Sequence, residues 1–291
     1  MSGYCGRLAP TPTGFLHVGH ALTFRVASDR ARQSGGRLVL RVEDLDPVRC
    51  QREFAEAALE DLKWMGISWD EGPIFQSTRR EEYLKAWRRL RDGGWIYPCR
   101  RSRKDVASAA LAPHGDEPVF PIAWRSDPGE AQNFSDPAGV NWRFRVPDEE
   151  AIVFADGNFG SVERVAVRDF GDFIVWNRDN VPAYELAVVV DDLACGITEI
   201  VRGADLLTST ARQILIYRAL GQKPPATFHT ALVVDQDGRR LAKRSGGWSL
   251  RELRERGLRP DDVSSPSSWA EWLKRSSPDG RGRETNPTPK V

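Results

Sequence analysis

Cysteine is scarce in this chain of 291 residues, which contains only Cys5, Cys50, Cys99 and Cys195. The four lie far apart, with no CxxC pair or other spacing typical of metal ligands. This pattern argues against a disulfide framework and against a self-contained metal knuckle. We therefore expect reduced, mostly buried thiols.

Long apolar runs are also missing. No uninterrupted apolar stretch is long enough to span a membrane, and the chain does not start with basic residues followed by an apolar segment, as a secretory leader would. A soluble cytoplasmic protein with no membrane partner is expected. Net charge is small as well, with 42 Lys and Arg against 41 Asp and Glu. Any surface that binds phosphate therefore has to be a local patch.

What the sequence does contain is the alternation of strands and helices typical of a doubly wound α/β protein. Residues 4–8 and 38–42 are predicted as buried strands, and each is followed by apolar residues at helical spacing. A third helix is expected around residues 83–90. Strands connected through helices form a parallel sheet, in which ligands bind at the carboxyl ends of the strands.

The periodicity weakens from Cys99 to about Pro147. There a basic cluster, Arg100 to Lys104, precedes a stretch rich in Pro, Gly and Asp, which predicts an insertion between sheet strands. The polar end of the chain, Ser276 to Val291, is expected to be disordered. A further helix is predicted over residues 210–220, and further strands at 142–146, 152–154, 172–176, 187–190 and 231–234.

The stretch RLAPTPTGFLHVGHAL, residues 7–22, follows the first strand. Glycines such as Gly19 permit tight turning and a close approach of a ligand to the main chain. His17 and His20 would share a face at the start of the next helix, where exposed amides and the helix dipole favour an anion. Imidazoles there can hydrogen-bond phosphate oxygens. So short a pattern also arises by chance, with histidines that only cap the helix.

A second constrained segment, GRRLAKRSGG, places Lys243 among arginines and glycines. A basic loop by itself is usually a solvated turn. Transfer of an adenylyl group, however, needs positive charge on the triphosphate as charge builds up on the leaving pyrophosphate, and a lysine loop can supply it.

Four stretches in order along the chain resemble the class I aminoacyl-tRNA synthetases of the glutamyl branch. HVGH and LAKRS are similar to the two ATP-binding motifs of that class, and LRVEDLDPVR and AYELAVVVDDLACGITEIVRGADLL are similar to segments between them. Few residues follow Lys243, too few for an anticodon-binding part. The resemblance therefore narrows to the glutamyl-Q tRNA(Asp) synthetases.

This resemblance implies a Rossmann-like α/β core with an inserted acceptor-type subdomain. The two halves of the nucleotide-binding core would be residues 1–98 and 171–275, the second with the lysine loop and a short helical end. The insertion would be residues 99–170, and 276–291 the tail. A monomer is expected.

The implied activity is ATP-dependent activation of L-glutamate to glutamyl-adenylate, followed by transfer to the queuosine base at the wobble position of tRNA(Asp). His17, His20 and Lys243 would stabilise the phosphates together with Mg²⁺, and Gly19 would belong to the ATP site. Arg100 to Lys104 and the arginines near Lys243 are candidates for the surface that contacts the tRNA backbone.

The family's glutamate pocket falls on six residues of this chain: Arg7, Ala9, Thr11, Glu43, Tyr184 and Arg202. Arg7 and Arg202 can each hold a carboxylate bidentately, and Glu43 can take the ammonium group. Tyr184 can close the pocket and donate a hydrogen bond. In an arbitrary α/β protein, Glu43 and Arg202 would instead form a structural ion pair, and Tyr184 would be a core aromatic.

The family often carries zinc in the insertion, on a C-x-C pair and a later Y-x-x-x-C. Here Cys99 is followed by Arg101 in place of the second cysteine, and FPIAW, with Phe120 and Trp124, replaces the later tyrosine and cysteine. One thiolate with His114 as the only nearby imidazole cannot make a tetrahedral site. We predict that zinc is absent and that apolar packing holds the insertion together.

Three other functions are compatible with parts of this pattern. A shortened enzyme could charge the 3′ end of tRNA(Glu), and a catalytically silent paralogue could bind tRNA. A small-molecule nucleotidyltransferase would share the HxGH-type phosphate site, but it would not explain the pocket for glutamate.

Overall fold

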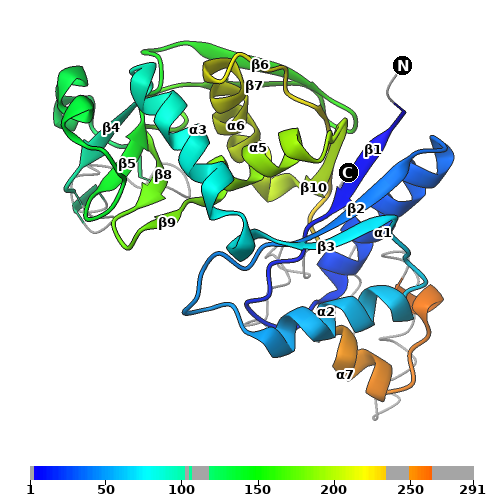
Figure 1. The fold of residues 1–291 in the computed structure, drawn as a ribbon. Helices are drawn as coiled ribbons and strands as arrows, with labels where there is room; N and C mark the ends of the chain where they lie inside the picture. The colour runs from blue at the N-terminus through cyan, green and yellow to red at the C-terminus, as the bar shows by residue number, and fades with distance from the viewer. Residues whose placement is uncertain (1–2, 102–104, 107–117, 234–248, 264–291) are drawn as a thin grey trace, which may run out of the picture. The chain divides into compact units, whose positions relative to one another are not determined.

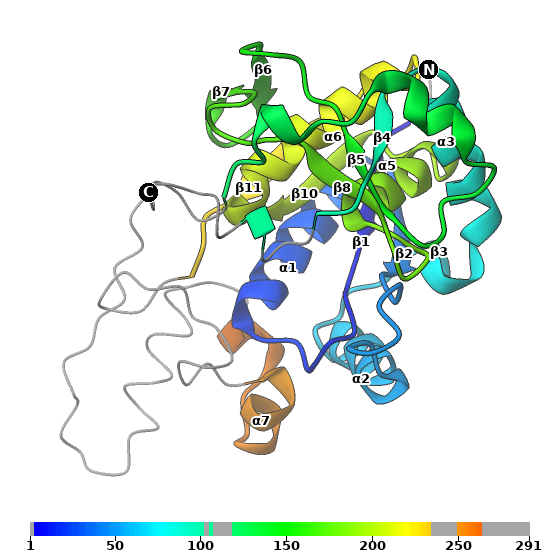
Figure 2. The same cartoon turned by 90° about the vertical axis from the view of Figure 1, so that its left-hand side faces the viewer.

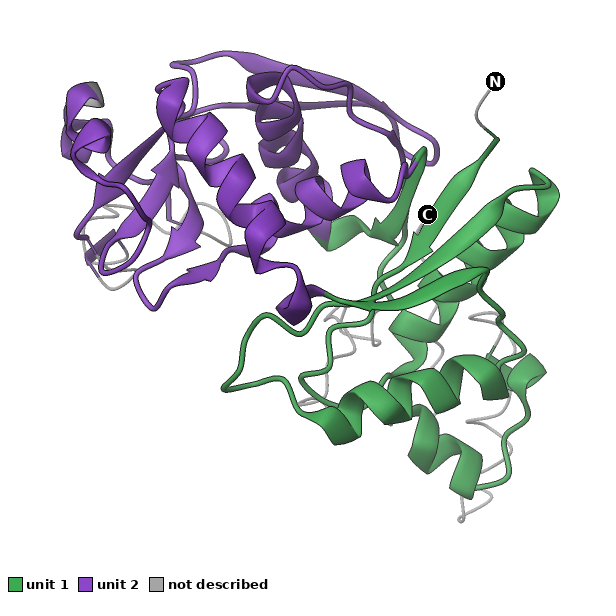
Figure 3. Ribbon diagram, viewed as in Figure 1, with its two compact units in different colours: residues 1–75, 198–205, 228–291 green, residues 76–197, 206–227 purple. Residues whose placement is uncertain are grey.

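The computed structural model describes residues 3–101, 105–106, 118–233 and 249–263. The chain divides into two compact units (Figure 3). Unit 1 comprises Met1–Phe75, Thr198–Asp205 and Phe228–Val291, and unit 2 comprises Gln76–Ile197 and Leu206–Thr227. In the described part of the chain, no helix is both long and apolar enough to cross a membrane.

Unit 1 is built on a parallel sheet of three strands in the order β1-β2-β3 (Figure 1). The strands β1 (Cys5–Leu8) and β2 (Arg37–Val42) are connected by α1 (Val18–Gln33), and α2 (Arg52–Trp64) leads to β3 (Glu71–Phe75). Beside β1, the amide of Thr198 donates to the carbonyl of Cys5 at 2.8 Å, just before β10 (Glu199–Gly203). This arrangement confirms the strands predicted at 4–8 and 38–42 and the helix predicted after each of them.

The strand β3 is not among the strands predicted from the sequence, whereas a short helical end after the lysine loop is expected there. β3 reads EGPIF, and its glycine and proline hide the strand signal, because such residues are confined to edges and irregular positions of sheets. A short helix, α7 (Leu250–Glu255), and the 3₁₀ turn η6 (Pro260–Val263) add Leu250, Leu253 and Val263 to the core formed by β1, β2, α1 and α2.

Unit 2 contains an antiparallel sheet in the order β4-β5-β8-β9. Its strands are β4 (Ile96–Cys99), β5 (Asn141–Phe144), β8 (Phe173–Asn177) and β9 (Val181–Pro182). The unit also contains a hairpin of β6 (Ala151–Asp156) and β7 (Gly160–Val165) and the helices α3 (Arg80–Asp92), α5 (Tyr184–Ala194) and α6 (Leu207–Ala219). Short 3₁₀ turns are η1 (Gln76–Thr78), η2 (Ile122–Trp124), η3 (Pro128–Asn133) and η4 (Ala204–Leu206).

Two predicted strands are wrong. Residues 187–190 belong to α5, where every residue from Glu185 to Asp192 is buried. A helix buried on all sides is apolar on all sides, so its run of Leu, Ala and Val cannot be told from a buried strand by periodicity. The strand predicted at 231–234 lies earlier, as β11 (Ala226–Thr230), and residues 231–233 are not in a strand.

The predicted apolar packing in the inserted segment is observed. Cys99 is buried with Tyr97, Val106 and Phe120, and Trp124 packs against them. The rings of Phe120 and Trp124 lie edge to face, with centroids 5.9 Å apart. The tail at 276–291 lies outside the described residues, and the boundaries predicted for the functional regions remain predictions.

Candidate active site

The two histidines that follow the first strand form a paired cap on α1. His17 is the N-cap residue, and its Nδ1 accepts a hydrogen bond from the Gly19 amide at 3.1 Å. The His17 amide in turn donates to Nδ1 of His20 at 3.3 Å. The ring centroids are 3.9 Å apart, so the two imidazoles share one face of the helix start, as predicted.

These contacts define which nitrogens carry protons. Because both Nδ1 atoms accept backbone hydrogen bonds, each neutral ring has its proton on Nε2. The site therefore offers two Nε2–H donors next to the amides at the N-terminus of α1, and the first turn of α1 contains no acidic side chain. Such an arrangement suits phosphate oxygens without requiring charged imidazoles.

Gly19 is required by the close approach of the His17 ring. A Cβ built at position 19 would lie 3.0 Å from Cε1 and 3.2 Å from Nδ1 of His17. Contacts this short would push the ring away from the amide that orients it. The glycine thus acts through the direction of the imidazole.

The basic segment around Lys243 lies outside the described residues, but the residues on both sides of it contact the α1 region. After the segment, the Leu250 amide donates to the Leu16 carbonyl at 2.8 Å, and Ser249 forms a β-bridge with His17. Before it, the Thr230 hydroxyl lies 3.0 Å from the Thr23 hydroxyl of α1. Figure 2 shows the chain running from β1 to the start of α1, near α7.

The two cationic candidates of the predicted glutamate pocket, Arg7 and Arg202, lie on the strands β1 and β10, which are close to one another. Arg7 is buried in β1, and its Nη1 donates to the Val201 carbonyl at 2.6 Å. Arg202 follows Val201 directly in β10 and is also buried. The guanidinium group of Arg7 therefore reaches the backbone of β10 next to Arg202, and the pocket itself remains a prediction.

Glu43, the candidate anion, is buried at the carboxyl end of β2. Its amide donates to the Pro10 carbonyl at 3.0 Å, which ties it to the loop after β1 that also carries Ala9. The Thr11 hydroxyl donates to Oε2 of Glu43 at 3.3 Å. The predicted residues of the first loop and of β2 therefore meet at one edge of the sheet.

Two residues at this edge were not found from the sequence. Arg41, almost fully buried, donates from Nη2 to Oε1 of Glu43 at 3.1 Å. His229 of β11 is fully buried, and its Nε2 accepts a hydrogen bond from Nε of Arg202 at 3.3 Å. Arg41 belongs to the stretch LRVEDLDPVR but was given no role there, and His229 belongs to no quoted motif. Only the alternation of side chains along β2 indicates that Arg41 and Glu43 share a face.

Tyr184 belongs to unit 2, as the first residue of α5, and is 37% exposed. It is therefore not the core aromatic of the alternative interpretation. The next residue, Glu185, is buried and accepts hydrogen bonds from the Ser209 hydroxyl and the Gln213 amide of α6, both at 2.8 Å. These bonds hold the first turn of α5, and hence the backbone of Tyr184, against α6.

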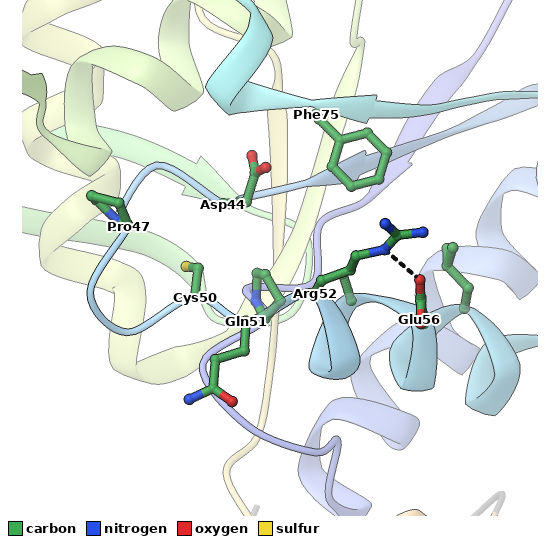
Figure 4. Close-up of a pocket in the computed structure, with 10 residues that line it drawn as sticks. Asp44, Pro47, Cys50, Gln51, Arg52, Glu56 and Phe75 are labelled. Atoms are coloured by element: carbon green, nitrogen blue, oxygen red, sulfur yellow. Dashed lines mark hydrogen bonds and ion pairs between the residues drawn. The ribbon is translucent and has the colours of Figure 1, made fainter.

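A pocket of about 480 Å³ adjoins the loop that follows Glu43 (Figure 4). Across the first turn of α2, Nε of Arg52 donates to Glu56 at 2.7 Å beside it. A pocket with apolar walls and a few polar groups suits a ring with a polar edge. Its walls include the apolar side chains of Pro12, Leu59 and Phe75 and the polar ones of Asp44, Cys50 and Gln51.

The described residues contain no group of three or more His, Cys, Asp or Glu side chains that could hold a metal ion. Mg²⁺ keeps several water ligands and is commonly bound through substrate phosphates with few protein groups. The residues present are therefore compatible with Mg²⁺ that arrives with a nucleotide.

Residues 5–263 match the family model of the catalytic domain of class I tRNA synthetases (E and Q). The chain is 44% identical over 272 residues to the glutamyl-Q tRNA(Asp) synthetase of Symbiobacterium thermophilum, covering 89% of this chain and 84% of the relative. It is 42% identical over 260 residues to the glutamate–tRNA ligase of Desulfosudis oleivorans, covering 88% of this chain and 54% of the ligase.

Among solved structures, the crystal structure of a glutamate tRNA ligase from Elizabethkingia meningosepticum, in complex with its amino acid, superposes with a TM-score of 0.72. The identity is 24%, and the match covers 88% of this chain and 53% of that one. This likeness concerns the fold, and it confirms the Rossmann-like α/β class predicted from the sequence.

Proposed function

Because the chain belongs to the class I tRNA synthetases (E and Q), a family of ligases, we propose that it activates L-glutamate with ATP and transfers it to the queuosine base at the wobble position of tRNA(Asp). The observation that supports the first step is the hydrogen bond from Arg7 to the Val201 carbonyl, next to Arg202. The amide of Glu43 is bonded to Pro10 in the loop that follows the strand of Arg7. The names of the relatives favour queuosine as the acceptor.

In the first step, a carboxylate oxygen of glutamate attacks the α-phosphorus of ATP. A new P–O bond forms, the bond to the bridging oxygen breaks, and pyrophosphate leaves. The Nε2–H groups of His17 and His20 donate to the phosphates as charge develops on them. Lys243 acts on the β and γ phosphates, and bound Mg²⁺ supplies further neutralisation of the triphosphate.

Glutamate is selected by complementary charge. Arg7 and Arg202 each face one of its two carboxylates, and Glu43 accepts from the ammonium group. Arg41 orients Glu43, and His229 orients Arg202 through Nε. Ala9 and Thr11 line the site from the first loop.

In the second step, a hydroxyl of the cyclopentene ring of queuosine attacks the activated carbonyl. The ester bond forms, the acyl–phosphate bond breaks, the hydroxyl proton is released, and AMP leaves with the electron pair of the broken bond. The pocket beside Glu43 supports an acceptor that carries a ring. Exposed arginines of the insertion, Arg100 and Arg101, would contact the tRNA backbone.

Two measurements test the proposal. Pyrophosphate should exchange into ATP only when glutamate is present, and mass spectrometry of wobble nucleosides should detect glutamyl-queuosine after incubation of tRNA with the protein and ATP. Absence of glutamate-dependent exchange would refute the activation step and favour a silent paralogue. Label found on the 3′ ribose after nuclease digestion would instead show a 3′-charging enzyme.

A further inference from the structure

The short helix α7 packs against the loop that carries His17, although neither the family motifs nor the proposed steps use it. Ser249 forms a β-bridge with His17, and the Leu250 amide donates to the Leu16 carbonyl at 2.8 Å. Ser249 also caps α7 through a reciprocal bond pair with Glu252. The start of α7 is therefore joined by its backbone to the residues just before the imidazole.

Arg251, the next residue, extends this contact to a side chain. Its guanidinium lies over the ring of Phe15, with Cζ 5.2 Å from the ring centroid. The same ring meets Phe54 of α2 edge to face, with centroids 4.9 Å apart. Phe15, only two residues before His17, is thus held between an aromatic ring of α2 and a cation of α7.

Acidic side chains of α2 also interact with the charge of Arg251. Nη1 of Arg251 lies 3.9 Å from Oε1 of Glu53, and the buried carboxylate of Asp61 interacts with the charges of Arg251 and Arg254. Of the two arginines, only Arg251 lies over an aromatic ring of the described residues. The two residues therefore differ in their contact with Phe15 but share their effect on Asp61.

We propose that Arg251 is a positioning residue for adenylation: by holding the Phe15 ring, it keeps the loop in the conformation that aims Nε2–H of His17 at the phosphates. The reason is local geometry. The Phe15 ring is only partly buried, so without the guanidinium over one face it can turn toward solvent. Rotation of Phe15 would shift Leu16 and His17, and small displacements of a catalytic group have large effects on rate.

The test compares Arg251→Ala, Arg251→Lys and the matched control Arg254→Ala with the wild type in glutamate-dependent pyrophosphate exchange, and so rests on the proposed function. Arg251→Ala should lower kcat about tenfold and leave the KM for glutamate within about twofold, because the glutamate site is untouched. Arg251→Lys should recover part of kcat, since it keeps a cation over the ring. Arg254→Ala should behave as the wild type.

A second readout does not need activity. The chain contains only four histidines, so the imidazole Cε1–H signals can be assigned by NMR with single His variants. Arg251→Ala should shift the signal of His17 and leave that of His229 unchanged, whereas Arg254→Ala should shift neither.

Equal kcat values for Arg251→Ala and Arg254→Ala, or an unmoved His17 signal, would overturn the inference. A parallel rise in the KM for glutamate would also overturn it, because that would indicate a general loss of structure. If the wild-type protein shows no exchange, the proposed function is refuted. The NMR signal of His17 would then test by itself whether Arg251 positions His17.

Discussion

Single residues in unit 1 act mainly by directing one another. Nδ1 of His17 is held by the Gly19 amide, Glu43 is held by Arg41, and Arg202 is held by His229. In each pair, a backbone or side-chain group fixes the orientation of a group proposed to meet substrate. Such support reduces the reorganisation needed as charge develops in a reaction.

Gly19→Ala tests the support of His17. The added Cβ would meet the imidazole at about 3.0 Å, so the ring would have to shift by a few tenths of an ångström from its position at the Gly19 amide. We expect the rate of pyrophosphate exchange to fall about tenfold or more, with little change in the thermal unfolding midpoint. Gly3→Ala is the matched control, because nothing lies within 4 Å of a Cβ at that position. Equal rates for the two variants would contradict the argument.

Arg202→Lys tests the glutamate site. Lysine keeps the positive charge but lacks the planar fork that holds a carboxylate bidentately and the Nε–H that donates to His229. We expect the KM for glutamate to rise roughly tenfold while the KM for ATP stays within about twofold. Steady-state exchange kinetics measure both constants, with the exposed Arg168→Lys as control. A larger rise in the KM for ATP than in that for glutamate would count against this role.

At the scale of elements, α2 and α7 form an interface with an unusual buried acid. Asp61 of α2 is 4% exposed, and its Oδ2 has no hydrogen-bond partner among the residues that the structure describes. Burial raises the pKa of Asp61 to about 6, although the charges of Arg251 and Arg254 lower it. The interface therefore tolerates the neutral acid better than the carboxylate.

This raised pKa gives a pH-dependent prediction. Between about pH 4 and 6 the folded protein binds a proton at Asp61 that the unfolded chain has lost, so the contribution of Asp61 to stability falls as pH rises through this window. In Asp61→Asn the side chain does not titrate, so this variant does not lose stability at position 61 as the pH rises. The variant should therefore gain stability relative to the wild type from pH 4 to 7, by about 2 kcal/mol in total.

Urea unfolding of both proteins across this pH range measures the difference and cancels the titration of other groups. Asp179→Asn, at an 84% exposed side chain, serves as the control and should show no such trend. A stability difference between Asp61→Asn and the wild type that is independent of pH would show that Asp61 titrates normally.

The inserted segment of unit 2 is held by packing and by one buried ion pair. Asp172 accepts hydrogen bonds from Nε and Nη2 of Arg125, both at 2.8 Å, and from the Tyr97 hydroxyl at 2.6 Å. The aromatic contact between Phe120 and Trp124 lies nearby in sequence. Burial together with the Asp172 carboxylate raises the pKa of Tyr97 far above its usual value, so the phenol stays a donor.

We propose that this packing replaces a zinc site, and chelation tests the proposal. EDTA should leave the thermal unfolding midpoint unchanged within about 1 °C, because no folding free energy would come from metal binding. Metal analysis of the purified protein should find no stoichiometric zinc. Zinc bound at one equivalent, or a large drop of the midpoint in EDTA, would reverse this conclusion.

At the scale of the whole molecule, the site residues predicted from the sequence are divided between the two units. Unit 1 carries the imidazoles, both pocket arginines and Glu43, whereas unit 2 carries Tyr184 and the exposed Arg100 and Arg101. We expect activation of glutamate to depend mainly on groups of unit 1. We expect contacts with the nucleic acid to involve the exposed arginines of unit 2.

Reversal of charge at two arginines of unit 2 should affect tRNA binding but not the activation of glutamate. Arg101→Glu together with Arg103→Glu should weaken tRNA binding and reduce its salt dependence, since fewer phosphate contacts release fewer counterions. Glutamate-dependent pyrophosphate exchange should stay at the wild-type rate. Binding is measured at several salt concentrations, and an unchanged slope would place the tRNA surface elsewhere.

The sequence by itself determined the elements of unit 1 from β1 to α2, because alternating apolar patterns and glycine stops are local signals. It also identified His17 and His20 as a pair, since residues three apart on a helix share a face. It was wrong at residues 187–190, where burial on all sides makes a helix as apolar as a strand. β3 stayed hidden for the opposite reason, because Gly and Pro weaken its pattern.

Only the tertiary structure decided which distant residues support the site. Arg7 donates to the Val201 carbonyl, and Arg202 donates to His229. These contacts form because the strands β1, β10 and β11, which are far apart in the sequence, lie close together in the fold. Likewise, Arg251 reaches Phe15 only because α7 packs on α1 and α2. Such contacts depend on how strands and helices pack, and no local pattern of residues records that packing.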